Sequence, residues 1–183
     1  MSNSTRYGKT MKLDDIGFYT LYDQRAKDVS KHTPLQRCEL LITDACNFRC
    51  PYCRGIKDEY SGTLSYIESL KVLDYWISEG LVNVRFSGGE PTVHKHLGDL
   101  VRHCANSKCV KRIAVSTNGS APQQKYEELL DAGVNDFSVS LDACCSSTGD
   151  TMAGVKGAFE QVLSNIEYLS KHTYITVGIV LTE

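Results

Sequence analysis

Long apolar runs are absent from this sequence, which has no stretch of about 18 apolar residues that could span a bilayer. A strong excess of charge of one sign is also missing, because 20 basic residues stand against 22 acidic ones and the formal net charge is -2. General electrostatic binding of nucleic acid is therefore disfavoured, whereas a local pocket for a small anion fits this balance. No basic start followed by an apolar run marks an export signal, so we expect a cytoplasmic protein that does not bind a membrane.

Cysteine, in contrast, is abundant, with eight residues in a chain of 183. Disulfide bonds would explain such a number in an exported protein, but the expected compartment is reducing. Three of the cysteines, Cys46, Cys50 and Cys53, lie within one short segment. This clustering favours metal or redox chemistry over a disulfide framework.

From residue 37 onward, short β-branched runs alternate with longer helical patterns, which is typical of βαβ units around a parallel sheet. Strands are predicted at Cys38–Thr43, Asn83–Phe86, Arg112–Ser116, Asp136–Leu141 and Tyr174–Leu181. Helices are predicted at Leu97–Asn106, Gln123–Ala132 and Val155–Ser170, and around the apolar positions Ile67, Leu70, Leu73, Trp76 and Ile77. The length and the 42% hydrophobic content fit one core domain, residues 37–183, preceded by an N-terminal extension, residues 1–36, on its surface.

The segment DACNFRCPYC, residues 44–53, places three cysteines at the spacing C-x3-C-x2-C directly after the first predicted strand. Three thiolates on one short loop can surround one face of a cubane iron–sulfur cluster and leave its fourth iron without a protein ligand. A zinc site is the alternative, since thiolates suit both metals and zinc normally takes four ligands. The fourth zinc ligand would have to be Cys38, Cys104, Cys109 or His94, and none of these has a convincing spacing.

The segment RFSGGEPT, residues 85–92, ends the second predicted strand. Gly88 and Gly89 would let the backbone turn sharply and approach a ligand closely. Backbone carbonyls and the Glu90 carboxylate would then be available to a cationic amine. A simpler interpretation is a strand-to-helix turn that requires the two glycines.

Four motifs follow successive predicted strands, namely CNFRCPYC, SGGEP, STNGS at 116–120 and VSLDA at 139–143. In this order they resemble the radical S-adenosylmethionine (radical SAM) superfamily, in particular the subgroup that includes the molybdenum-cofactor GTP cyclase and peptide-modifying enzymes. The resemblance runs from about Cys38 to the C-terminus and makes zinc the weaker interpretation. It implies an α/β fold, a partial (β/α) TIM-like barrel of parallel strands. Only five strands are predicted where the family usually has six, so the barrel is expected to be truncated after the fifth.

The resemblance also implies a set of cofactor contacts. The ligands of a [4Fe-4S] cluster would be Cys46, Cys50 and Cys53. The adenine of S-adenosylmethionine would meet the backbone of Tyr52, and its amino group would meet the segment Ser87, Gly88, Gly89 and Glu90. The strand-end positions that reach the ribose, the methionine moiety or the substrate would be Thr117, Asn118, Ser140 and Asp142.

The activity that the resemblance implies is reductive cleavage of S-adenosylmethionine to a 5′-deoxyadenosyl radical, which abstracts hydrogen from an unidentified small-molecule or peptide substrate. An electron donor such as flavodoxin or ferredoxin is implied as a partner. Two alternatives stay open: an activase for a glycyl-radical enzyme, and a non-catalytic truncated remnant that binds a cluster. Because the strand at Tyr174–Leu181 would have an unpaired edge, a second copy or a C-terminal partner is expected to complete the barrel.

Several further side chains have two interpretations. Cys144 and Cys145 could act at the site as hydrogen donors, redox partners or ligands of a second cluster, or could lie in a surface loop, CCSSTGD. Phe48 and Phe86 could line the reaction space or pack in the core. His94 and His96 are interpreted as the polar start of a helix.

Overall fold

Five parallel strands form one sheet in the part of the chain that the computed structural model describes, residues 37–53 and 62–180. Their order is β1 (Arg37–Thr43), β2 (Asn83–Gly88), β3 (Arg112–Thr117), β4 (Asp136–Ser140) and β5 (Tyr174–Gly178). Each strand pairs in parallel with the next one along the chain. The prediction of an α/β fold with parallel strands is therefore confirmed. The N-terminal extension predicted for residues 1–36 lies outside the described residues.

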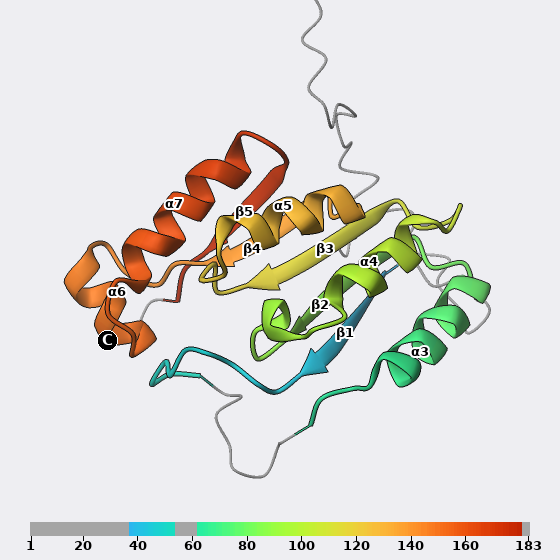
Figure 1. The fold of residues 1–183 in the computed structure, drawn as a ribbon, viewed down its shortest axis with the longest axis horizontal. Coiled ribbons are helices and arrows are strands. Elements are labelled where there is room, and N and C mark those ends of the chain that lie inside the picture. The colour runs from blue at the N-terminus through green and yellow to red at the C-terminus, as the bar shows by residue number, and fades with distance from the viewer. Residues whose placement is uncertain (1–36, 54–61, 181–183) are drawn as a thin grey trace, which may run out of the picture.

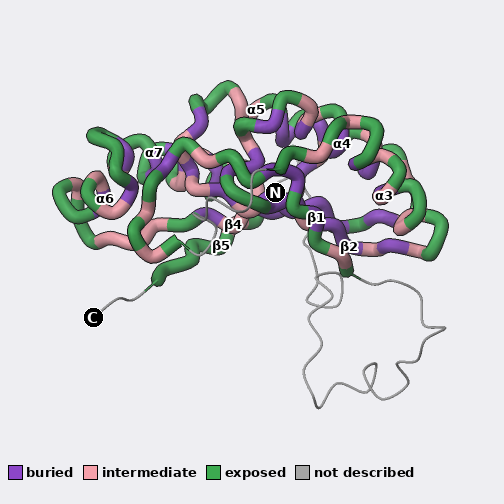
Figure 2. Tube along the Cα trace, turned by 90° about the horizontal axis from the view of Figure 1, so that it is seen from below, coloured by how far each residue is buried: buried purple, intermediate pink, exposed green. Residues whose placement is uncertain are grey.

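Helices cover one face of this sheet and leave the other face without a helix in the described ranges (Figures 1 and 2). The helical elements are α3 (Tyr66–Ser78), a short 3-10 turn η1 (Pro91–Val93), α4 (Leu97–Ala105), α5 (Gln123–Ala132), α6 (Ser146–Ala153) and α7 (Ala158–Ser170). In Figure 2 the helices form one layer and the strands form a second layer below it. Parallel strands with helices on one side give a curved, partial barrel. None of the helices described is long and apolar enough to pass through a bilayer.

Helix α3 begins at a capping box. The Ser65 hydroxyl accepts the Glu68 amide at 3.2 Å, and the Glu68 carboxylate accepts the Ser65 amide at 2.9 Å. Leu73 is fully buried, whereas Ile67, which was predicted to share its face, has 58% of its surface exposed. Ile67 precedes Leu73 by six residues, which places it about 120° around the helix from the buried face. The prediction for Ile67 was therefore wrong.

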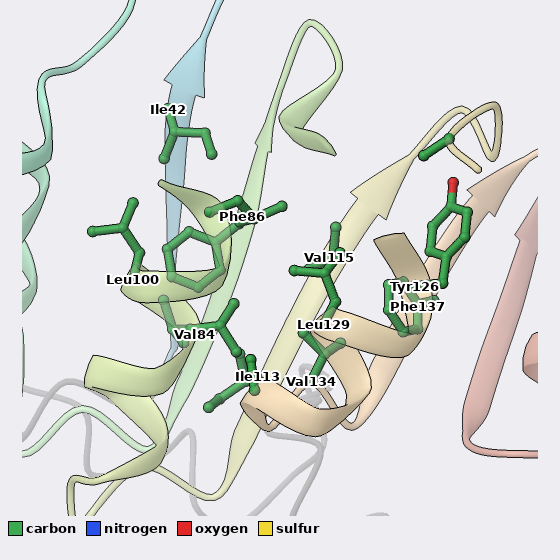
Figure 3. Close-up of a cluster of buried hydrophobic side chains, with 14 of the residues drawn as sticks. Ile42, Val84, Phe86, Leu100, Ile113, Val115, Tyr126, Leu129, Val134 and Phe137 are labelled. Atoms are coloured by element: carbon green, nitrogen blue, oxygen red, sulfur yellow. The ribbon is translucent and has the colours of Figure 1, made fainter. Parts of the chain in front are cut away.

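Side-chain alternation gives the sheet one apolar face and one polar face. The apolar face packs against the helices, as the cluster around Phe86, Val115 and Phe137 shows (Figure 3). The Tyr126 ring from α5 meets the Phe137 ring edge-on at 5.6 Å. Phe86 is fully buried in this cluster, so it is a core residue.

The opposite face of the sheet carries charged side chains. Arg112 of β3 and Asp136 of β4 form a buried ion pair there. Arg85 of β2 lies in register with Ala114 of β3, which in turn pairs with Asp136, and its guanidinium donates to Ser116 at 2.7 Å. The inner wall of the partial barrel therefore carries charged side chains at β2, β3 and β4.

Helix α6 was not predicted. Residues of the expected surface loop CCSSTGD form its first turns, and the predicted helix Val155–Ser170 begins only at Ala158. Packing with α7 explains the difference, because a Cβ at Gly149 would lie 2.6 Å from the Phe159 ring. The Asp150 carboxylate also accepts two backbone N–H groups at the start of α7, at 2.6 and 3.0 Å.

Strand β5 lies at one edge of the sheet and pairs only with β4 among the described residues. It ends at Gly178, earlier than predicted, and Leu181 lies outside the described residues. Tyr174 is 50% exposed and Val177 is 39% exposed. Within the described chain, the free edge expected for this strand is present.

Candidate cluster and cofactor site

A cavity of about 260 Å³ opens at the carboxyl ends of the strands. It brings together predicted site residues from four strand-end loops, as parallel topology requires. These residues are Cys46, Cys50, Tyr52, Cys53, Gly88, Gly89, Thr117, Asn118, Ser140 and Asp142. Two predicted residues, Ser87 and Glu90, do not line it.

The three clustered cysteines face this one cavity from the loop that follows β1. The Phe48 amide donates to the Cys46 sulfur at 3.4 Å, and the Asn118 side-chain amide approaches the same sulfur at 3.8 Å. Burial raises the pKa of Cys46 and of Cys50, so the free thiols are neutral at pH 7 and a bound cation would be needed to ionise them. Three sulfurs around one space, with N–H donors directed at one of them, fit an iron–sulfur cluster.

A single zinc ion fits these residues less well. Nowhere in residues 37–53 and 62–180 are three His, Cys, Asp or Glu side chains grouped so as to hold a metal ion, and this applies to the three cysteines as well. None of the four candidates for a fourth zinc ligand lines the cavity. His94 is buried, donates from Nε2 to the Leu64 carbonyl at 3.0 Å and accepts the His96 amide at Nδ1 at 3.3 Å. Helix α4 begins after His96, so only His96 stands at a helix start.

The two glycines of the SGGEP segment pack against the first residues of the cysteine loop. The Gly89 amide donates to the Thr43 carbonyl at 2.7 Å, and a Cβ at Gly89 would lie 2.3 Å from the Ala45 carbonyl oxygen. Gly88 has a φ of +133°, and its Cβ would lie 2.1 Å from the Thr43 oxygen. The chain's own backbone packs so closely against these two positions that both must be glycine. Both glycines also border the cavity.

The Glu90 carboxylate, which was expected to be available to a ligand amine, is engaged by the chain itself in this structure. Glu90 is fully buried. Its Oε1 accepts from the Thr92 amide and hydroxyl and from the Thr117 hydroxyl at 2.8 Å, and its Oε2 accepts from the Asn118 amide at 2.6 Å. Burial raises the pKa of Glu90, and the four hydrogen bonds act in the opposite direction. The carboxylate joins the loop after β2 to the loop after β3.

Ser87 also differs from expectation. It lies in β2, is almost fully buried and does not reach the cavity. Its neighbours Gly88 and Gly89 provide the cavity wall in this segment.

The cysteine loop is held to several elements along its length. The Asn47 amide donates to the Ser120 hydroxyl at 2.7 Å and accepts from Asn118 at 2.9 Å. The Arg49 amide donates to the Ala153 carbonyl at the end of α6 at 2.8 Å. The Tyr52 hydroxyl donates to the Asp142 carboxylate. The loop therefore crosses the ends of β3 and β4 as well as joining β1.

An apolar wall of the cavity comes from residues that the sequence interpretation did not identify. Its members in α6 and α7 are Gly149, Met152, Ala153, Ala158, Phe159 and Val162. Helix α6 was interpreted as a loop, so nothing indicated that its residues would face the cysteines. Phe48, one of the two candidate aromatic residues, also lines the cavity.

Cys144 and Cys145 do not line the cavity. Both are exposed, and their sulfurs lie 3.6 Å apart. Cys145 is the N-cap residue of α6, and hydrogen bonds from Thr148 and Ser147 lower its pKa to about 6. The pair therefore lies at the start of a helix and includes one acidic thiol.

The comparisons with known proteins agree with this fold. Residues 40–182 match the sequence profile of the Radical SAM superfamily. The GTP 3′,8-cyclase of Vibrio vulnificus (strain YJ016) is 32% identical over 143 residues, which cover 74% of this chain and 42% of the cyclase. The corresponding cyclase of Aliarcobacter butzleri (strain RM4018) is 34% identical over 134 residues, covering 71% of this chain and 41% of the cyclase.

Solved structures show the same fold. SuiB of Streptococcus suis bound to S-adenosylmethionine has a TM-score of 0.68 at 18% identity, covering 83% of this chain and 35% of SuiB. BtrN in complex with AdoMet and 2-DOIA has a TM-score of 0.62 at 20% identity, covering 80% of this chain and 57% of BtrN.

Parallel strands, a cavity at their carboxyl ends and three cysteines facing it define a partial barrel of the radical SAM type. The chain belongs to the radical SAM superfamily. This is a family of enzymes that bind a [4Fe-4S] cluster and S-adenosylmethionine. The chain spans less than half the length of the curated relatives it matches.

Proposed function

We propose that this chain holds a [4Fe-4S] cluster on Cys46, Cys50 and Cys53 and cleaves S-adenosylmethionine reductively. The resulting 5′-deoxyadenosyl radical would abstract hydrogen from a small molecule or peptide. The observation that supports this best is the single cavity, which all three cysteines share with the loops after β2, β3 and β4. The GTP cyclases named above are much longer than the matched region, so their substrate is not assigned to this chain.

The protein's contribution would be binding, orientation and exclusion of water. When bound, the cluster supplies the electron that breaks the S–C5′ bond and offers one iron without a protein ligand. Gly88 and Gly89 border the cavity, and their backbone carbonyls could accept from a ligand amine. The exposed Ser140 hydroxyl offers a hydrogen-bonding group at the end of β4.

Met152, Phe159 and Val162 form part of an apolar wall on the α6 and α7 side of the cavity. Such a wall would exclude water and avoid polar groups that compete for the ligand. It carries no titratable group.

The proposed reaction requires an electron donor and a reducing compartment. A reduced flavodoxin or ferredoxin would supply the electron. All eight cysteines are free of disulfide bonds in the structure, which supports a reducing location such as the cytoplasm.

We also infer one core domain, residues 37–183, with a separate N-terminal extension, residues 1–36. The match of the family profile to residues 40–182 supports this division.

A further strand partner fits the free edge of β5. Exposed β-branched residues on an unpaired edge promote pairing with another chain. A second copy of the chain, or a C-terminal segment, would complete the barrel and close the cavity on this side.

The test is 5′-deoxyadenosine release. Protein reconstituted with iron and sulfide without oxygen, then reduced with dithionite, should release 5′-deoxyadenosine from S-adenosylmethionine, as measured by liquid chromatography. A variant with Cys46, Cys50 and Cys53 replaced by Ala is the matched control and should release none. A protein that binds the cluster but releases no 5′-deoxyadenosine would contradict the proposal and support a non-catalytic cluster-binding protein.

A further inference from the structure

The Asp142 carboxylate joins the cysteine loop to the ends of β4 and β5, at the edge of the sheet. One oxygen, Oδ2, accepts the hydroxyl proton of Tyr52. The other oxygen, Oδ1, accepts the backbone amide of Val180 at 2.7 Å. Asp142 lies just after β4, and Val180 lies just after β5. One carboxylate therefore links the loop to the ends of two neighbouring strands.

Tyr52 stands between two of the predicted cluster ligands. The Cys53 amide donates to the Cys50 carbonyl at 3.0 Å, which closes a tight turn with Tyr52 inside it. The Tyr52 hydroxyl reaches Asp142, which follows 90 residues later in the sequence. A shift of Tyr52 would therefore also move Cys50 and Cys53, which lie in the same turn.

Other contacts hold only the earlier part of the loop. Thr43 and Ala45 bond to the loop after β2, Asn47 bonds to the loop after β3, and Arg49 bonds to the end of α6. Beyond Arg49, the bond from Tyr52 to Asp142 is the one hydrogen bond in the described chain that joins residues 50–53 to the strands.

We propose that Asp142 is a positioning residue that holds the Cys50–Cys53 turn over the ends of β4 and β5 through the Tyr52 hydroxyl. This role differs from the contact with cofactor or substrate that the family resemblance implies for Asp142, since both carboxylate oxygens are engaged by the chain itself. The importance of the turn for iron rests on the proposed function. The hydrogen bonds of Asp142 with Tyr52 and Val180 are present in the cluster-free protein, so their effect can be measured in that form.

The Tyr52 phenol donates its proton to a carboxylate. A donor to a carboxylate makes a charge-assisted hydrogen bond, which is stronger than a bond between neutral groups.

The first experiment uses cluster-free protein and measures alkylation rates of individual cysteines by mass spectrometry. Tyr52→Phe and Asp142→Ala should each raise the rates at Cys50 and Cys53 several-fold, because the turn is released from the strands. Asp142→Asn should raise these rates less than Asp142→Ala, since its amide oxygen can still accept the Tyr52 proton while its N–H₂ group meets the Val180 amide. Cys109, which lies in another part of the fold, serves as the internal reference.

Two controls separate this effect from general loosening of the fold. Tyr75→Phe removes a phenol from the exposed side of α3 and should change neither rate. The double variant Tyr52→Phe/Asp142→Ala should react no faster than Asp142→Ala alone, because Tyr52→Phe then removes no further hydrogen bond. Unchanged rates at Cys50 and Cys53 in both single variants, with far-ultraviolet circular dichroism like that of the wild type, would overturn the proposal.

The second experiment uses reconstituted protein and follows iron loss to a chelator under anaerobic conditions. Tyr52→Phe and Asp142→Ala should lose iron several-fold faster than the wild type, and Asp142→Asn should lose it more slowly than Asp142→Ala. If the wild type takes up no cluster while the alkylation rates still differ, the proposed function fails and the positioning role stands. If the cluster forms and both rates match the wild type, the positioning role fails.

Discussion

The hydroxyl of Thr117 donates a hydrogen bond of 2.8 Å to the buried carboxylate of Glu90, which joins the loops after β3 and β2. Three further hydrogen bonds complete the surroundings of this carboxylate. The SGGEP and STNGS motifs, recognised as separate signals in the sequence, are therefore parts of one buried network. The carboxylate holds the cavity wall in place without facing the cavity.

Glu90→Gln is expected to destabilise the cluster-free protein by about 1–3 kcal/mol. The glutamine amide would place an N–H₂ group at one carboxylate oxygen position, where the chain offers only donors. Urea denaturation followed by circular dichroism measures this change. Glu79→Gln at the exposed end of α3 is the control and should stay within about 0.5 kcal/mol of the wild type. Equal stability of the two variants would contradict the network.

Gly89→Ala is expected to impair cluster assembly as well as cofactor binding. The added Cβ would meet backbone atoms of Asp44 and Ala45, which cannot move without displacing the cysteine loop. Iron content per chain after reconstitution should fall well below that of the wild type. Gly98→Ala in α4 has ordinary contacts, with its nearest neighbour at 3.6 Å, and should bind iron normally. Full iron content in Gly89→Ala would show that the loop tolerates the displacement.

The purified protein, reconstituted anaerobically, is expected to be brown and to bind about four irons per chain. Replacing Cys46, Cys50 and Cys53 together by Ala should remove the colour and the iron. Replacing the exposed pair Cys144 and Cys145 by Ser should leave both, because neither residue lines the cavity. Iron quantification and visible absorption provide the measurement, and one bound zinc in place of iron would contradict the assignment.

Cys145 is expected to be alkylated quickly at pH values where an ordinary thiol is still protonated. Its pKa is about 6, so the reactive thiolate predominates above that pH, and the rate should reach half its maximum near pH 6. Iodoacetamide labelling from pH 5 to pH 9 with peptide mass spectrometry tests this. Thr148→Ala should move the midpoint upward, because it removes the largest source of stabilisation of the thiolate. A midpoint near 9 in the wild type would exclude an acidic thiol.

Much of the fold could be predicted from local sequence. Helix α5 has the predicted bounds, and the five strands lie where β-branched runs alternate with helical patterns. Helix α6 could not be predicted, because Ser, Thr, Gly and Asp are weak helix formers and its stability comes from packing on α7.

The sequence predicted which residues form the site better than it predicted the contacts between them. Motif spacing placed the cysteines, Asn118 and Asp142 at strand ends that meet in one cavity. Local sequence could not show that Glu90 turns inward, since its partners come from residues 92, 117 and 118. The same holds for Tyr52 and Asp142, which are brought together only by the parallel topology.

The attachment of the cysteine loop has a consequence for the order in which the chain folds. Asn47 and Tyr52 bond to Ser120 and Asp142, partners that follow 73 and 90 residues later in the sequence. Contacts of such long range form late, since the intervening chain must be ordered first. During synthesis the three cysteines would leave the ribosome well before the elements that fix them. Iron capture would therefore belong to the last stage of folding, after β4 and α6 have joined the sheet.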